Sequence, residues 1–310
     1  MKYDRTLLKT GLLLLVILLF MGCRRDNKEI NFELSSSNQP IVTFKTGNNK
    51  EYHLMFDTGW TPPCLYEKGM EKVYSTHKRF KFIDNYLIKL VIEKKYPEMY
   101  RKEMDHREFF YGKNHYLPVN FRYFKTGKSI FTKKKFYYTP LQLSGYSQNS
   151  KDGVFGIDFL GEVRNITIDY NNGKIILNDD RLDTTYCDMY EMQVPYHYAI
   201  SINIDGKEEL AEIDTGCNAF IISQRFVDQN INIYSGEHNG KAREKDYLFN
   251  KIEICGISFE NITGYLSTDP RNHTSEASIE RTQEISLLGY SFFRDRVIQL
   301  DFENGEFCIK

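Results

Sequence analysis

The chain has 310 residues, and its 41 Lys and Arg against 42 Asp and Glu give a formal net charge of −1. This balance excludes a general affinity for nucleic acid or for anionic surfaces, and the length allows two domains or one large two-lobed structure. Aromatic residues make up 15% of the chain, with 22 Phe and 22 Tyr against a single Trp. This composition favours β-strands.

Residues 1–22 have the pattern of an export signal. Basic residues precede an unbroken apolar run over residues 12–20. The run is shorter than the roughly 20 residues that a transmembrane helix needs, and it fits the core of a signal peptide. Cys23 follows at once, and the junction resembles a bacterial lipobox, in which this cysteine becomes the lipidated first residue. The resemblance implies a lipoprotein anchored to a membrane of the bacterial cell envelope; the alternative is an uncleaved anchor.

Residues 23–40 are polar and contain the run Ser35-Ser36-Ser37-Asn38-Gln39-Pro40. Such a composition cannot bury a core. It therefore predicts a flexible tether between the lipid and the folded body.

A β-prone run over residues 51–56 is predicted to be a strand, and it ends in Asp57-Thr58-Gly59. Gly takes a positive φ without steric cost, so a Gly two residues after a carboxylate suits a sharp turn. The sequence therefore predicts that a tight loop holds Asp57 at the end of a strand.

Residues 67–107 carry apolar side chains at intervals of three to four positions, with Lys and Glu between them. This periodicity predicts an amphipathic helical insertion, which either packs on the body or acts as a lid. Farther on, Gly112 lies among aromatic residues that include Tyr111 and Tyr116. This arrangement predicts a hairpin tip, which is either an ordinary hairpin or a flap over a substrate.

The second half of the chain repeats this order. A polar linker at residues 181–192 leads into strands that end in Asp214-Thr215-Gly216, and Cys217 follows. Ser is favoured at helix N-caps, so Ser223 is predicted to cap a short helix that runs through Val227.

Five cysteines follow Cys23 in the chain: Cys64, Cys187, Cys217, Cys255 and Cys308. Export permits disulfides, but an odd number cannot pair completely, and no Cys or His spacing indicates a zinc site. Most of these cysteines are therefore interpreted as small buried apolar residues, while spacing alone leaves any bridge undefined.

The surroundings of the two Asp-Thr-Gly tripeptides also repeat. Val154–Leu160 matches Leu287–Phe293, with Gly156 and Gly289 at equivalent places, and each copy precedes a strand pair with an acidic turn. The missing side chain at Gly156 permits another backbone segment to approach closely. An internal repeat of this kind indicates that the chain consists of two related halves.

These residues carry a family resemblance. The order apolar-Asp-Thr-Gly, then apolar-apolar-Gly, then a closing strand resembles that of retropepsin-like aspartic proteases, with two copies in one chain as in pepsin-like enzymes. The resemblance implies an all-β, pseudo-twofold, two-lobed acid-protease barrel fold with a partly helical insertion in the first lobe. The N-terminal lobe is expected over residues 41–180 and the C-terminal lobe over residues 193–310, as a monomer that contains an internal pseudo-dimer.

The resemblance also implies the chemistry. Asp57 and Asp214 would face each other and activate a water molecule that hydrolyses a peptide bond, with no metal or other cofactor. The partner would be a peptide or protein substrate. The loops that carry the two carboxylates would be supported by Thr58, Gly59, Thr215 and Gly216.

Two positions depart from the family pattern, because Trp60 and Cys217 stand where Ser, Thr or Ala usually follows the Gly. Trp60 either lines a substrate subsite or fills the site, so the alternative function is a catalytically inactive binding lipoprotein. A thiol nucleophile at Cys217 would need a His base within hydrogen-bond reach. The histidines of this half, His197, His238 and His273, lie elsewhere in the sequence, and none has the sequence context of a cysteine protease. A self-processing or single-target protease also stays open.

The same two departures predict a pH dependence. A hydroxyl after the Gly can bond a carboxylate and favour its ionised form, whereas Trp does not do so in the same way and a thiol does so weakly. A mildly acidic to neutral optimum is therefore expected.

Overall fold

The computed structural model describes residues 28–47, 49–66, 68–69, 72, 117–138, 152–230, 237–238, 244–267 and 284–310. Within these ranges the protein is mostly β, and the helices are short: α6 (Ile157–Leu160), α7 (Gln224–Gln229) and α9 (Tyr290–Phe293). None of the helices in the described ranges is long and apolar enough to cross a membrane. Several predicted features lie outside the described residues: the export signal, Cys23, most of the helical insertion at 67–107, and the flap residues Tyr111, Gly112 and Tyr116.

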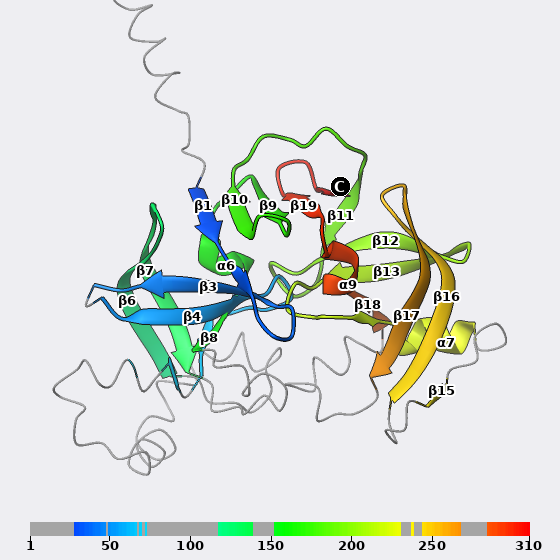
Figure 1. The fold of residues 1–310 in the computed structure, drawn as a ribbon, viewed down its shortest axis with the longest axis horizontal. Helices are drawn as coiled ribbons and strands as arrows, with labels where there is room; N and C mark the ends of the chain where they lie inside the picture. The colour runs from blue at the N-terminus through cyan, green and yellow to red at the C-terminus, as the bar shows by residue number, and fades with distance from the viewer. Residues whose placement is uncertain are drawn as a thin grey trace, which may run out of the picture.

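The first half forms a sheet that curls on itself (Figure 1). In spatial order its strands are β2 (Glu33–Leu34), β3 (Pro40–Lys45), β4 (Glu51–Phe56), β8 (Gly153–Phe155), β5 (Cys64–Leu65), β7 (Ser129–Tyr138) and β6 (Leu117–Thr126). A single residue pair, Lys45 with Lys125, brings β3 and β6 together. Buried aromatic side chains fill the interior of this sheet.

The second half contains a closed barrel of six strands. In spatial order these are β12 (Tyr198–Ile204), β13 (Lys207–Ile213), β18 (Ser286–Leu288), β14 (Phe220–Ile221), β17 (Ile257–Ser267) and β16 (Glu244–Ile254). Two residue pairs between β12 and β16, Asn203 with Glu253 and Ile204 with Ile252, complete the closure. Strand β15 (Glu237–His238) pairs with the outer side of β16.

A further run of strands joins the two halves, between them at the top of the view in Figure 1. Its order is β1 (Lys28–Asn31), β10 (Lys174–Leu177), β9 (Asn165–Asp169), β19 (Val297–Asp301), β20 (Glu306–Ile309) and β11 (Tyr186–Glu191). The closing hairpin of each half lies at the centre, where β9 pairs antiparallel with β19. The strand that precedes each half lies at the outside.

Two segments that were expected to be irregular are strands. Residues 28–34, which composition assigned to the tether, form β1 and β2, and Ile30 and Phe32 are buried. The linker at 181–192 contains β11, which pairs with β20 and β12. In residues 28–34 exposed side chains flank the buried Ile30 and Phe32, as expected for a strand with one face on the protein. In β11 only Met189 is buried, so both segments have a polar average composition.

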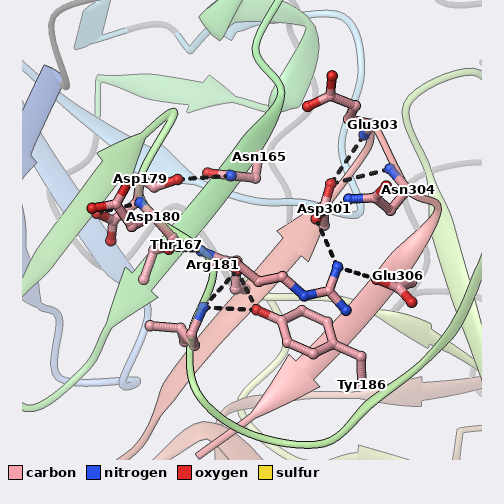
Figure 2. A network of polar contacts seen from close by, with 12 residues as sticks. Asn165, Thr167, Asp179, Asp180, Arg181, Tyr186, Asp301, Glu303, Asn304 and Glu306 are labelled. Carbon is pink, nitrogen blue, oxygen red and sulfur yellow. Dashed lines mark hydrogen bonds and ion pairs between the residues drawn. The ribbon is translucent and has the colours of Figure 1, made fainter.

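Polar contacts tie the linker to both closing hairpins (Figure 2). The buried Gln299 amide donates from Nε2 to Thr167 Oγ1 at 2.7 Å and accepts at Oε1 from the Tyr186 hydroxyl at 2.5 Å. Arg181 stacks on the Tyr186 ring at 3.8 Å and pairs with Glu306 at 2.5 Å. The halves are therefore joined by a polar network as well as by backbone pairing.

Of the five described cysteines, two form a disulfide and three carry thiols. Cys187 on β11 forms a disulfide with Cys255, in the turn between β16 and β17. The interpretation as buried apolar residues holds for Cys64 and Cys308, whose thiols are buried. It does not hold for the disulfide pair or for Cys217, whose thiol is half-buried. Burial raises the pKa of the Cys308 thiol, which keeps it protonated and unreactive.

Candidate active site

The two Asp-Thr-Gly tripeptides occupy equivalent places in the two sheets. We name Asp57–Gly59 the first arm and Asp214–Gly216 the second arm. The first arm follows β4, which runs parallel to β8, and the second follows β13, which runs parallel to β18. Each arm continues its strand by one more hydrogen bond, from Asp57 N–H to Phe155 O and from Asp214 N–H to Leu288 O, both 3.0 Å. The predicted position of each aspartate at a strand end is therefore confirmed.

A glycine behind each arm lets the chain pass closely. A Cβ on Gly156 would collide with the carbonyl oxygen of Trp60 and lie 3.1 Å from that of Asp57. A Cβ on Gly289 would lie 2.6 Å from the carbonyl oxygen of Cys217. The close approach predicted at Gly156 is confirmed, and it recurs at the repeated position.

The two threonines bind the arms to each other. Thr58 N–H donates to Thr215 Oγ1 at 3.0 Å, and Thr215 N–H donates to Thr58 Oγ1 at 3.1 Å. Each hydroxyl then donates to the strand of the opposite half, Thr58 to Ile213 O at 2.6 Å and Thr215 to Phe56 O at 3.2 Å. These bonds are buried and reciprocal, so the position of one arm fixes the position of the other.

Each carboxylate lies against the glycine of the opposite arm. A Cβ on Gly216 would collide with the carboxylate of Asp57, and a Cβ on Gly59 would lie 2.9 Å from Cγ and Oδ2 of Asp214. Only 4% of Asp57 and 7% of Asp214 is exposed. The structure thus brings the six predicted arm residues into one site, with both carboxylates at its centre.

Backbone N–H groups hold the two carboxylates. Asp57 Oδ1 accepts from Gly59 N–H at 2.9 Å. Asp214 Oδ1 accepts from Gly216 N–H and from Cys217 N–H, both at 2.9 Å. Such donors stabilise the ionised form of a carboxylate.

The two side chains that depart from the family pattern are directed at backbone carbonyls. The Trp60 indole donates from Nε1 to Pro62 O at 2.8 Å and packs on the small cluster of Met55, Cys64 and Val154. The Cys217 thiol donates to Ala219 O at 3.2 Å.

Of the three histidines considered as a base for Cys217, His197 is buried and bonds Glu212 through Nδ1 at 2.7 Å. His238 lies on β15, and His273 lies outside the described residues.

Two buried tyrosine hydroxyls near the arms were not predicted. Burial, then the charges of Cys64 and Asp57, raise the pKa of Tyr66, and burial, then Asp214, raise the pKa of Tyr170. Both phenols therefore stay protonated. Within the described part of the chain, neither hydroxyl oxygen has a hydrogen-bond partner.

Gln39 was also missed, because it was assigned to the tether. It is buried, and its Nε2 donates to Gly216 O at 2.7 Å. The internal repeat could have shown that Gln39 lies inside the fold, because it corresponds to His197 in the second half. Gln39 lies two residues before Ile41, which pairs with Met55. His197 likewise lies two residues before Ala199, which pairs with Glu212.

Among the residues that the structure describes, no group of three or more His, Cys, Asp or Glu side chains could hold a metal ion. What the site offers chemically is a pair of adjacent, nearly buried carboxylates on rigid arms. No protein-family model matches the chain, and no curated protein sequence matches it significantly.

Proposed function

We propose that the protein is an aspartic endopeptidase, tethered to the bacterial cell envelope through Cys23, that hydrolyses peptide bonds with a water held between Asp57 and Asp214. We also propose that its fold is the pseudo-twofold, two-lobed fold of the acid proteases. The observation that carries it is reciprocal: each carboxylate lies against the glycine of the opposite arm, and the threonines cross-bond the arms.

The chemistry follows from two carboxylates in a confined space. Like charges so close cannot both ionise cheaply, so the pair holds one proton between them. The ionised member takes a proton from the water, and the protonated member donates a hydrogen bond to the carbonyl oxygen of the peptide. Water attacks the carbonyl carbon directly, so no covalent enzyme intermediate forms. The C–N bond of the tetrahedral species then breaks as the carboxylate pair passes a proton to the leaving amine nitrogen. A positioned acid or base of this kind contributes typically about 10²–10⁴-fold to the rate.

The substrate is a peptide in extended conformation that forms strand-like main-chain hydrogen bonds beside the arms. One chain supplies both arms, so a monomer suffices for activity. The pairing of the Trp60 indole with Pro62 O, and its packing on Met55, are compatible with a wall of an apolar subsite.

The test uses the purified protein with casein and a peptide library across pH 3–8, with and without pepstatin. Cleavage is expected in the wild type and is expected to fall by at least about 10²-fold in Asp57→Asn and in Asp214→Asn. Asp295→Asn is the matched control, because its side chain is 80% exposed. Full cleavage by either arm variant would exclude the paired mechanism.

A second candidate is a binding lipoprotein without catalysis. The observation that favours it is the bulky Trp60 directly after the first arm. If the protein is such a binding lipoprotein, the wild type is expected to be folded and to cleave nothing at any pH. Trp60→Ser is also expected to cleave nothing. Cleavage that requires both aspartates would eliminate it.

A further inference from the structure

A buried amide from the first half reaches the second arm. Gln39 lies directly before β3, is 6% exposed, and donates from Nε2 to the carbonyl oxygen of Gly216 at 2.7 Å, across 177 positions of sequence. A carbonyl oxygen only accepts, so the amide must present its NH₂ group here.

The carbonyl that Gln39 binds belongs to the peptide between Gly216 and Cys217. In a planar trans peptide the C=O and the N–H point in opposite directions. The N–H of this same peptide, on Cys217, donates to Asp214 Oδ1 at 2.9 Å. Fixing the oxygen on one side therefore orients the donor on the other side toward the carboxylate, and successive hydrogen bonds polarise one another.

Gln39 is itself held in place by its own turn. Its Oε1 accepts from Ser37 Oγ at 3.2 Å, and its main-chain N–H donates to Ser35 Oγ at 3.1 Å. The main-chain N–H of Ser35 in turn donates to Gln39 O at 2.9 Å. A side chain with both ends bonded loses little freedom when it holds the Gly216 carbonyl, so it acts as a preorganised support.

In the second half, the side chain at the equivalent place bonds a strand residue. His197 takes the equivalent place before β12, and it bonds Glu212, two residues before Asp214. A side chain from the start of each half thus contacts the segment that carries Asp214. His197 contacts Glu212, which precedes Asp214, and Gln39 contacts Gly216, which follows it.

We propose that Gln39 is a positioning residue of the carboxylate pair: through the Gly216–Cys217 peptide it directs an N–H donor at Asp214 and so favours this carboxylate as the ionised member. This inference rests on the proposed peptidase function. Removing the amide donor leaves Asp214 in place but weakens the donor that stabilises its charge.

The test compares Gln39→Met, which keeps the length and loses the donor, with Gln39→Glu. The matched control is Gln224→Met, because Gln224 donates from an exposed amide to Asp228. Gln39→Met is expected to lower kcat about tenfold with KM changed less than about twofold, since small misplacements at a reacting group cost rate rather than binding. The acid limb of its pH profile is expected to move to higher pH, because the ionised carboxylate is less stabilised.

Gln39→Glu adds a second readout. An ionised glutamate cannot donate to the Gly216 carbonyl, whereas a protonated one can. The loss of kcat in Gln39→Glu relative to wild type is therefore expected to shrink as the pH falls through about 4.3, the ordinary pKa of a Glu side chain. A role limited to packing would not produce this recovery.

Hydrogen exchange of the Cys217 amide tests the contact without any activity. Exchange is expected to be about tenfold faster in Gln39→Met, since the bond that orients this peptide is lost. If kcat, the acid limb and the Cys217 amide exchange of Gln39→Met all equal those of the wild type, the inference is overturned. The same holds if only the melting temperature falls and these three quantities are unchanged. If the wild type cleaves nothing, the proposed peptidase function fails, and amide exchange still decides whether Gln39 holds this peptide. Should Gln39→Met fail to fold, the test moves to Ser37→Ala, which removes the bond to Gln39 Oε1 together with the hydrogen bond to Ser35 Oγ. Ser37→Ala must then show the same changes to a smaller degree, and its equality with wild type would overturn the inference.

Discussion

The two halves present their arms alike and both bury aromatic rings, but they differ at one equivalent position of the interior. The first half is packed with aromatic rings around Phe44, whose ring lies 5.3–6.1 Å from those of Phe124, Phe131, Phe155 and Phe159. Edge-to-face pairs of this kind stabilise a core beyond the area that they bury.

The second half has a buried carboxylate, Glu209, where the first half has the aromatic side chain of Tyr52. Glu209 lies five residues before Asp214, as Tyr52 lies five residues before Asp57, and both are buried. Glu209 accepts from Ser223 and Ser286 at 2.7 and 2.9 Å and pairs with Arg225 at 2.8 Å. These contacts connect β13 with β18 and with the N-cap of α7.

The comparison teaches that the arms do not depend on one kind of core. A parallel strand pair, a glycine behind the loop and a cross-bonding threonine recur in both halves. The interior chemistry is free to differ, because what positions each aspartate is main-chain pairing. Substitutions in the arms should therefore act on activity, and substitutions in the cores should act on stability in ways that differ between the halves.

The largest effect is expected for Gly216→Ala. Its Cβ would collide with the Asp57 carboxylate, whereas the Cβ of Gly59→Ala would lie 2.9 Å from Asp214 and can be relieved by a smaller shift. We expect kcat/KM to fall by at least about 10²-fold in Gly216→Ala and by less in Gly59→Ala. The control is Gly47→Ala, whose Cβ makes an ordinary contact at 3.4 Å with the Tyr123 hydroxyl. Equal activity in all three variants would show that the carboxylates do not meet the opposite glycines.

The next effect separates the cores. Glu209→Ala removes a carboxylate that satisfies two buried serine hydroxyls and the half-exposed Arg225. We expect the free energy of unfolding to fall by about 2–4 kcal/mol, measured by urea denaturation. Tyr52→Phe at the equivalent place keeps the ring and is expected to cost less than about 1 kcal/mol. A reversed order would mean that the polar network of the second half is dispensable.

The threonines should behave alike in the two halves. Thr58→Val and Thr215→Val each remove two buried hydrogen bonds, and each is expected to lower the free energy of unfolding by about 1–3 kcal/mol. Because the two residues bond each other, the double variant should lose less than the sum of the single losses. Strict additivity would contradict reciprocal bracing of the arms.

The smallest effect concerns pH. We expect wild-type cleavage to peak at mildly acidic to neutral pH, because the Cys217 thiol donates to Ala219 O and is a weak donor. Cys217→Ser supplies a hydroxyl that favours the ionised carboxylate, so the acid limb should move to lower pH by up to about one unit. A wild-type profile that already peaks in strong acid would refute this expectation.

Local patterns predicted much of this arrangement. The arms and the closing hairpins could be predicted because each is a short motif that occurs twice, and the Ser223 cap is confirmed by its hydroxyl, which accepts from Phe226 N–H at 3.1 Å. Strand β1 was missed because its partner, β10, lies more than a hundred residues away in sequence. Strand β11 pairs with the nearby β12 as well as with the distant β20, and it was missed because Met189 is its single buried residue and no apolar periodicity marks it. Gln39 was missed for the same reason as β1, since the meaning of a buried amide depends on a carbonyl that only the fold supplies.

The central claim is that Asp57 and Asp214 form one pair, and the most direct measurement is the distance between their nearest carboxyl oxygens in a crystal structure determined at the pH of maximal stability. We expect a distance of about 3 Å, close enough to share a proton and a single bridging water. A separation above about 6 Å, or a Trp60 indole inserted between the two carboxyl groups, would contradict it.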